Sequence, residues 1–308
     1  MIISRRTAWT LSIALCLAMV ATAAVAGELE SKFKPGDKLG YVQTMNLQMS
    51  LTMFGSSLGD AQTKRTIEFD REVLKPNDQK RRRIQITVRS VQLEETSQGE
   101  PAKTYSTISG DEPGAPEQQL YAALVNKPVV VVLDNKNNVV QVDGREALVE
   151  SVQSKISTPE DKQAVAGEFD SLFSDTTDIG ALVNIRDLDP QKKVKPGDSW
   201  EKIWGGEVVD ADTMPAQITL KSREGDLAKL EYAVKTDDLR KTLEQPANPG
   251  DPPTKVDRLK VEGNIDFNTN SGTVVRSEDL IDMAMSMGEE GQATMSMAIT
   301  ATIILQVK

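Results

Sequence analysis

The sequence predicts an α+β protein made of two related, curved antiparallel β-sheet halves with long strands, bridged by a short helical segment. Three observations support this fold class: long runs in which apolar and polar residues alternate, a turn phrase that occurs twice, and helical spacing confined to the middle of the chain. Alternation with a period of two is typical of strands that bury one face, whereas apolar residues three and four apart are typical of helices.

The longest alternating runs are residues 41–53 and 294–307. In the first run, the odd positions carry Met45, Leu47, Met49, Leu51 and Met53, and polar residues stand between them. At about 3.3 Å per residue, strands of this kind extend to ~45 Å and are expected to twist and curl. Hairpins are predicted within residues 67–88, 218–234 and 259–275, and a central strand, apolar on both faces, within residues 128–133.

The turn phrase Lys-Pro-Gly-Asp occurs at residues 34–37 and again at residues 195–198, each time before a predicted strand. Pro sets φ at one central position of such a turn, and Gly tolerates a positive φ at the next. We therefore expect a first β-rich half over residues 27–144, a helical bridge over 145–190, and a second β-rich half over 191–308, packed together as one unit. Within the bridge, the spacing predicts helices over 145–156, from Pro159 onward, and around 179–185.

Residues 1–26 have the pattern of a cleaved signal peptide. Arg5 and Arg6 precede the apolar run Ala8–Val20, and small residues stand at 24–26. A run of about 13 residues is too short for a membrane-spanning helix. The sequence thus predicts an exported protein, periplasmic or extracellular, with no integral membrane span after cleavage. Whether the signal is of the twin-arginine type stays open.

Removal of that segment leaves a chain without histidine or cysteine, because the sequence has no histidine and its one cysteine is Cys16. This excludes an imidazole base, a thiolate nucleophile and a disulfide. Gly55-Ser56-Ser57-Leu58-Gly59 fits the pattern of a hydrolase nucleophile elbow, but the chemistry requires an imidazole, so a turn is expected. Residues 266–272 partly match the sequence pattern of a calcium-binding loop, but their Asn-Ser-Gly is also typical of a hairpin turn.

The charge balance argues against a nucleic acid partner. The net charge of −10 becomes −12 when Arg5 and Arg6 are lost, since residues 1–26 hold no acid, and this sign repels phosphate backbones. We predict no catalytic residue, no metal and no cofactor, and the sequence leaves the oligomeric state open.

The methionines are the most informative residues that remain. Apart from Met214, all those beyond the signal segment lie in three strand segments, and the last two segments are expected to form a hairpin with its methionines on one face: Met45, Met49 and Met53; Met283, Met285 and Met287; Met295 and Met297. Thioethers suit Cu(I). They also form deformable apolar surfaces, which either fill space or line a groove for a lipid-like ligand.

Lys195-Pro196-Gly197-Asp198-Ser199-Trp200, with a later Gly263-x-Ile265-x-Phe267, resembles an uncharacterised family of bacterial secreted proteins and lipoproteins that share this phrase and a β-rich body. The resemblance implies an envelope location and no assigned activity. We therefore predict a non-enzymatic envelope protein that binds an apolar or lipid-like ligand or another envelope component, or that acts as a scaffold. A carboxylate-dependent hydrolase or lyase is the alternative from another class.

Overall fold

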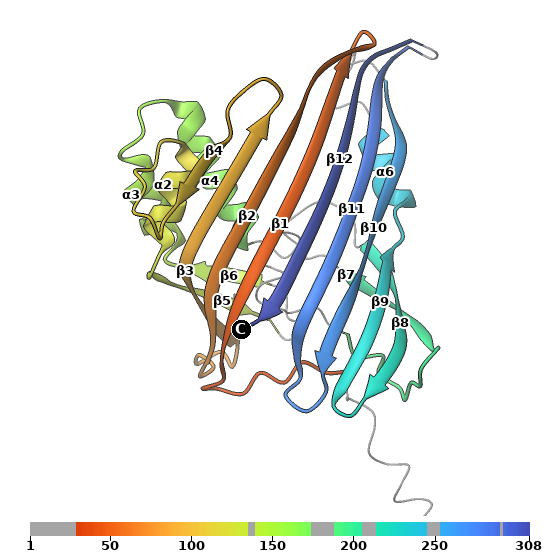
Figure 1. Ribbon diagram of the computed structural model, residues 1–308. Helices are drawn as coiled ribbons and strands as arrows, with labels where there is room; N and C mark the ends of the chain where they lie inside the picture. The colour runs from red at the N-terminus through yellow and green to blue at the C-terminus, as the bar shows by residue number, and fades with distance from the viewer. Residues whose placement is uncertain (1–28, 135–138, 174–187, 205–213, 245–252, 290–291) are drawn as a thin grey trace, which may run out of the picture.

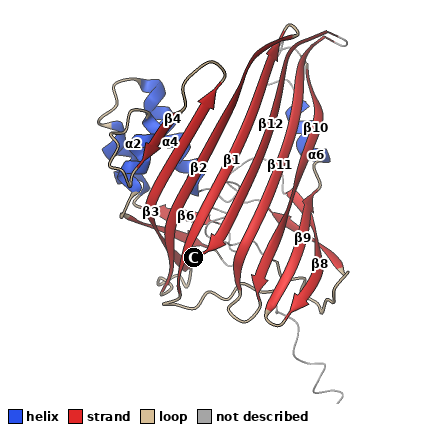
Figure 2. Ribbon diagram, in the orientation of Figure 1, coloured by secondary structure: helices blue, strands red, loops and turns tan. Residues whose placement is uncertain are grey.

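The computed structural model describes residues 29–134, 139–173, 188–204, 214–244, 253–289 and 292–308. Within these ranges the chain forms one open sheet of 12 strands and four short helices, which confirms the β-rich α+β class (Figure 1). Figure 2 shows that helices contribute little beside the long strands. The predicted signal peptide and the predicted helix around 179–185 lie outside the described residues.

The strands and helices follow one another in two series. The first series comprises β1 (Lys38–Met53), β2 (Ser56–Leu74), β3 (Arg82–Ser97), β4 (Lys103–Ser106), α2 (Pro116–Leu124), β5 (Pro128–Leu133) and β6 (Val139–Asp143). The helices α3 (Arg145–Gln153) and α4 (Pro159–Phe173) come next. The second series comprises β7 (Ser199–Trp204), β8 (Met214–Glu224), β9 (Leu227–Val234), α6 (Asp237–Glu244), β10 (Thr254–Asn268), β11 (Thr273–Glu289) and β12 (Gln292–Val307).

Each series is an antiparallel meander, and the two meanders join through the first and last strands. The order across the sheet is β6-β5-β3-β2-β1-β12-β11-β10-β9-β8-β7, with β4 attached to β3. β1 pairs with β12 from Tyr41 opposite Val307 to Met53 opposite Met295. The two halves expected from the sequence therefore share one continuous sheet, whose edges are β6 and β7.

The two Lys-Pro-Gly-Asp phrases form the same turn. In each, the Asp N–H donates to the Lys carbonyl at 3.0 Å, and the glycine, Gly36 or Gly197, has φ of +95°. In each, the Gly N–H and the Asp carbonyl also bond one residue of the neighbouring strand, which is Val73 in β2 and Leu220 in β8. The hairpins β1–β2 and β7–β8 thus begin in the same way, as expected of related halves.

One face of the sheet, which we call the core face, carries two clusters of buried side chains. The first cluster packs Tyr41 and Phe69 of the central strands against β3, β5 and the helices α2, α3 and α4. The second includes Trp200, Ile265 and Phe267, together with Leu29 from the segment before β1. Arg71 lies between the rings of Phe33 and Tyr41, at 5.7 and 5.4 Å, and its burial lowers the pKa of its guanidinium. The core is therefore split into two parts along one face.

The expectation that helices interrupt only the middle of the chain is wrong. α2 lies in the first half, where Leu120, Tyr121 and Leu124 pack into the first cluster, and α6 lies in the second half beside β10. Both helices are short, and α6 has few apolar residues, so neither produces a long helical pattern in the sequence. None of the helices among the described residues combines the length and apolar character that a membrane span requires.

Candidate functional site: the methionine face

The strand register brings all eight predicted methionines onto the core face, at the end of the sheet where β1 turns into β2. Three neighbouring strands, β1, β12 and β11, contribute successive rows: Met53–Met295–Met287, Leu51–Met297–Met285 and Met49–Ile299–Met283. Two further rows follow, Leu47–Ala301–Ile281 and Met45–Ile303–Asp279. Side chains directly opposite one another in such rows have Cβ atoms about 4.5–5.5 Å apart, so the methionines form one continuous surface.

We call this surface the methionine face and define it as the eight methionines together with Leu47, Leu51, Ile281 and Ile299. Met49 and Met295 are 38% and 36% exposed, and the other methionines are half-buried. Among the described residues, no methionine belongs to either buried cluster. The opposite side of the same strands carries polar residues such as Asn46, Gln48 and Ser50. The apolar surface therefore continues the core face beyond the two cores.

A band of buried polar side chains closes the lower end of the methionine face. Arg65 lies beside Met45 in the register, and Asp279 lies two strands away in the same row. Gln43 and Ser277 stand in the next row, and all four side chains are at most 6% exposed. Arg65 donates from Nη1 to the Tyr121 hydroxyl at 2.8 Å, and its Nη2 lies 3.9 Å from Met45 Sδ. The apolar surface thus ends at a cation and a carboxylate.

Asp279 is held by a close-packed unit with Tyr232 and Gly263. The Tyr232 hydroxyl donates to Asp279 Oδ1 at 2.6 Å, and both groups are buried. Tyr232 pairs with Gly263 across β9 and β10, and a Cβ at position 263 would lie 2.7 Å from the Tyr232 ring and 2.9 Å from Asp279 Oδ1. Glycine at this position therefore lets the tyrosine ring lie against the sheet and reach the carboxylate.

Helix α6 covers β10 at the side of the methionine face. Val256 and Leu259, which pair with Met285 and Met283, are only 1% and 9% exposed. The helix is fixed to the backbone of β10 because Arg240 donates to the Val256 carbonyl at 2.5 Å and Glu244 accepts from the Val256 N–H at 3.0 Å. The methionines on β11 are therefore bordered by a covered strand on this side.

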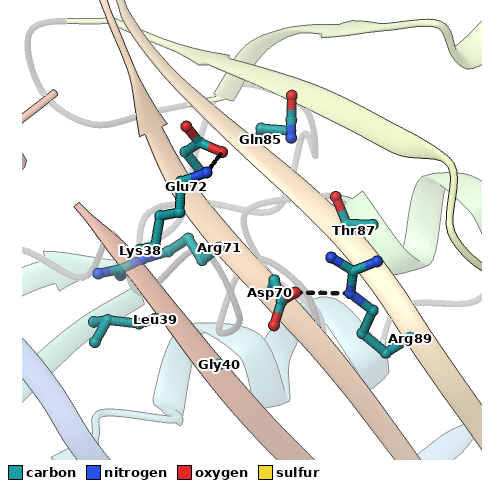
Figure 3. Close-up of a pocket in the computed structure, with 9 residues that line it drawn as sticks. All are labelled: Lys38, Leu39, Gly40, Asp70, Arg71, Glu72, Gln85, Thr87 and Arg89. Carbon is teal, nitrogen blue, oxygen red and sulfur yellow. Dashed lines mark hydrogen bonds and ion pairs between the residues drawn. The ribbon is translucent and has the colours of Figure 1, made fainter. Parts of the chain in front are cut away.

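A hollow of about 250 Å³ lies on the opposite face of the sheet and is lined by β1, β2 and β3 (Figure 3). Gly40 lies among its lining residues, and ion pairs join the side chains around it: Arg89 to Asp70 at 2.7 Å and Lys38 to Glu72 at 2.8 Å. The carboxylates in these ion pairs are those of Asp70 and Glu72. Each contacts a cation across a partly exposed surface, and the thickness of the sheet separates them from the methionines.

The other sequence motifs have structural roles. Residues 55–59 belong to the β1–β2 hairpin, so Ser57 lies in a strand and not at a strand-to-helix turn. In the β10–β11 turn, Asn268 Oδ1 accepts from the N–H groups of Asn270 and Ser271 at 3.0 and 2.9 Å. Trp200 is 7% exposed within the second core cluster. Within the described residues, no three acidic side chains are grouped in a way that would hold a metal ion.

Comparison with protein families identifies a match over residues 79–274 to a family of unknown function, DUF6263. The chain belongs to the DUF6263 family. This membership agrees with the predicted uncharacterised, β-rich domain, and it assigns no activity. A comparison with curated protein sequences finds no match.

Three of the solved structures to which this DUF6263 chain is similar, all at very low identity, illustrate the likeness. One is DynF from the dynemicin biosynthesis pathway of Micromonospora chersina, at 6% identity and a TM-score of 0.21, with 88% of this chain and 82% of that one covered. Another is the COG4313 outer membrane channel from Pseudomonas putida F1, at 8% identity and a TM-score of 0.23, with 90% of this chain and 97% of that one covered. A third is a β-barrel-like protein of the domain of unknown function DUF1849 from Brucella abortus, at 11% identity and a TM-score of 0.14, with 88% of this chain and 98% of that one covered. Likenesses at these scores carry no inference about function.

The polar band was missed in the sequence. Its members come from three strands, with Gln43 on β1, Arg65 on β2 and both Ser277 and Asp279 on β11, and only the pairing of the first strands with the last ones brings them together. The available signal was that Arg65 and Asp279 stand two positions before the apolar residues Ile67 and Ile281, so each is a charged residue on the face that these apolar side chains share.

Proposed function

We propose that this protein is a non-enzymatic component of the bacterial envelope, exported by residues 1–26, and that it binds an apolar or lipid-like molecule along the methionine face. The observation that carries the proposal is the three rows in which seven of nine positions are methionine, half-buried or exposed, outside both cores. Methionine side chains are unbranched and polarisable, so such a surface adapts to flexible apolar molecules.

The dimensions and the polar end favour a ligand with a long apolar chain. From Met45 to Met53 the face extends about 26 Å at 3.3 Å per residue. The hydrocarbon core of a bilayer, about 30 Å thick, holds two layers of acyl chains, so one extended chain fits along the face. A polar head group would then meet the band at Arg65 and Asp279, where charged side chains end the apolar surface.

Replacing Met297 with glutamine tests this function, because the side chain keeps its length but gains an amide that ligand binding would desolvate. We expect the affinity for a fluorescent fatty acid analogue to fall roughly tenfold, since an unsatisfied buried amide costs about 1–3 kcal/mol. The affinity is measured by fluorescence titration of delipidated protein. Native mass spectrometry of protein from its host is expected to show a bound lipid that is reduced in M297Q.

Ile108→Gln is the matched control, because Ile108 is 64% exposed and lies outside the methionine face. Its affinity for the analogue should equal that of the wild type. Equal affinity of M297Q and wild type, or a wild type that binds neither the analogue nor a host lipid, would contradict the proposed function.

A Cu(I) site is the second candidate, and the row Met53–Met295–Met287 is the observation that favours it. Three thioethers on adjacent strands are soft ligands of the kind that this ion prefers. Titration of the protein with Cu(I) against a colorimetric chelator tests the site. Competition by the wild type that is lost in Met295→Leu supports copper, whereas chelator spectra unchanged by the wild type exclude it.

A further inference from the structure

The turn between β1 and β2 presents exposed apolar side chains at the end of the sheet. Phe54 is 76% exposed and Leu58 is 56% exposed, which are high values for residues of this size. We call Phe54, Gly55 and Leu58 the hairpin tip. In Figure 1 the tip lies at the far end of the strands from the C-terminus, beside the end of β11 and the start of β12.

The backbone of the hairpin tip makes the presence of phenylalanine unexpected. Met53 pairs with Ser56, so Phe54 and Gly55 form a two-residue loop, with φ values of +49° and +75°. Loops with positive φ at both positions favour Asn-Gly, and a bulky residue at the first position is strained. The other non-glycine residues with positive φ in the described ranges are polar: Lys80, Asn126 and Gln191. Neither turn geometry nor packing therefore explains Phe54.

The part of β1 that leads to the hairpin tip, and the neighbouring strand β12, carry no charge. Residues 40–59 and residues 292–307 contain no Asp, Glu, Lys or Arg, although 27% of the chain is charged. Both segments lie side by side as β1 and β12. A surface of this kind can leave water without the desolvation of an ion, which is the largest cost of transfer to an apolar medium.

The hairpin tip is continuous with the methionine face. Met53, which precedes Phe54, begins the row Met53–Met295–Met287, while the polar band lies at the opposite end of the face. A molecule that entered at the hairpin tip would move along the methionines before its polar group reached Arg65. The tip is thus placed at the entrance of the proposed ligand surface.

We propose that the hairpin tip inserts into the interfacial region of a lipid bilayer, where Phe54 and Leu58 are buried, and that lipid-like molecules pass there between the bilayer and the methionine face. The second part rests on the proposed function, whereas the insertion itself does not. A bilayer fits the tip better than a protein surface, because the exposed groups are apolar and aromatic and include no charge to specify a protein partner. The net charge of the protein favours neutral over anionic lipid.

Phe54→Asn separates membrane insertion from folding, because the two properties should change in opposite directions. Asn-Gly suits the loop, so we expect the melting temperature of F54N to rise by roughly 1–3 °C. Flotation with phosphatidylcholine vesicles should fall roughly tenfold or more, since the variant loses the aromatic side chain that is buried in the bilayer. Ile108→Asn is the control and should float as the wild type does.

Binding of the fluorescent fatty acid analogue is measured on the same proteins without vesicles. Retained binding with lost flotation in F54N supports both proposals. If F54N floats as well as the wild type, the proposed insertion is wrong. The insertion is also wrong if the wild type binds the analogue but does not float with the vesicles. In both cases, binding of the analogue by the wild type means that the proposed function stands. If no protein binds the analogue but F54N alone loses flotation, insertion is supported and the proposed function is wrong.

Discussion

Replacing Gly263 with valine is expected to destabilise the protein by about 4 kcal/mol. A Cβ at this position would lie 2.4 Å from the Glu278 carbonyl oxygen, 2.7 Å from the Tyr232 ring and 2.9 Å from Asp279 Oδ1. The neighbouring backbone cannot move away easily, and displacement of Tyr232 would remove its hydrogen bond to the buried Asp279 carboxylate. Overpacking and a weakened buried hydrogen bond each cost about 1–3 kcal/mol. Urea unfolding followed by circular dichroism measures the loss.

Gly167→Ala provides the control for this prediction. Gly167 lies in α4 with nothing within 4 Å of an added Cβ, and alanine is the better helix former by roughly 1 kcal/mol. That variant should be as stable as the wild type or slightly more so. A Gly263→Val protein that unfolds at the wild-type urea concentration would show that the Tyr232 ring does not lie against this glycine in solution.

Replacing Tyr41 with alanine is expected to lower the free energy of unfolding by about 3–5 kcal/mol. We expect this loss to affect the unfolding of the whole sheet. The Tyr41 side chain is 0% exposed, its ring stacks on Phe69 with centroids 5.3 Å apart, and the Arg71 guanidinium lies 5.4 Å from it. Removal of a buried aromatic side chain leaves a cavity as well as exposed apolar surface. The loss therefore exceeds that of an ordinary surface substitution.

The same variant tests whether the two core clusters unfold together. Tyr41 belongs to the first cluster and Trp200 to the second, and β1 and β12 connect them through the sheet. We expect tryptophan fluorescence and circular dichroism to report one common transition, shifted to lower urea in Tyr41→Ala. A fluorescence transition that stays at the wild-type urea concentration while the circular dichroism transition shifts would show that the second half is stable by itself.

The long strands were predictable because the alternation in residues 41–53 and 294–307 requires no knowledge of neighbours. β1 and β12 begin and end within a few residues of these runs. That β1 pairs with β12 was not predictable, since the pairing joins the first and last strands and depends on the register of the whole sheet.

The exposure of the methionine side chains was not predictable either, and a comparison of two residues on β1 gives the physical reason. Tyr41 and Met49 lie on the same face of β1, yet Tyr41 is fully buried and Met49 is 38% exposed. A period of two identifies the apolar face but not how far a second layer covers it. Here the first core covers the lower end of β1, and the upper end extends beyond it.

The pairing of β1 with β12 also determines when the methionine face can exist during folding. β1 and β2 form a local hairpin and so do β11 and β12, but the rows from Met53 to Met287 are complete only when the first and last strands meet. Contacts between segments so far apart in sequence form late, because closing a long loop costs conformational entropy. A chain without its C-terminal strand would hold the methionines of β1 but no continuous surface, so the ability to bind an apolar ligand is expected to appear only in the last step of folding.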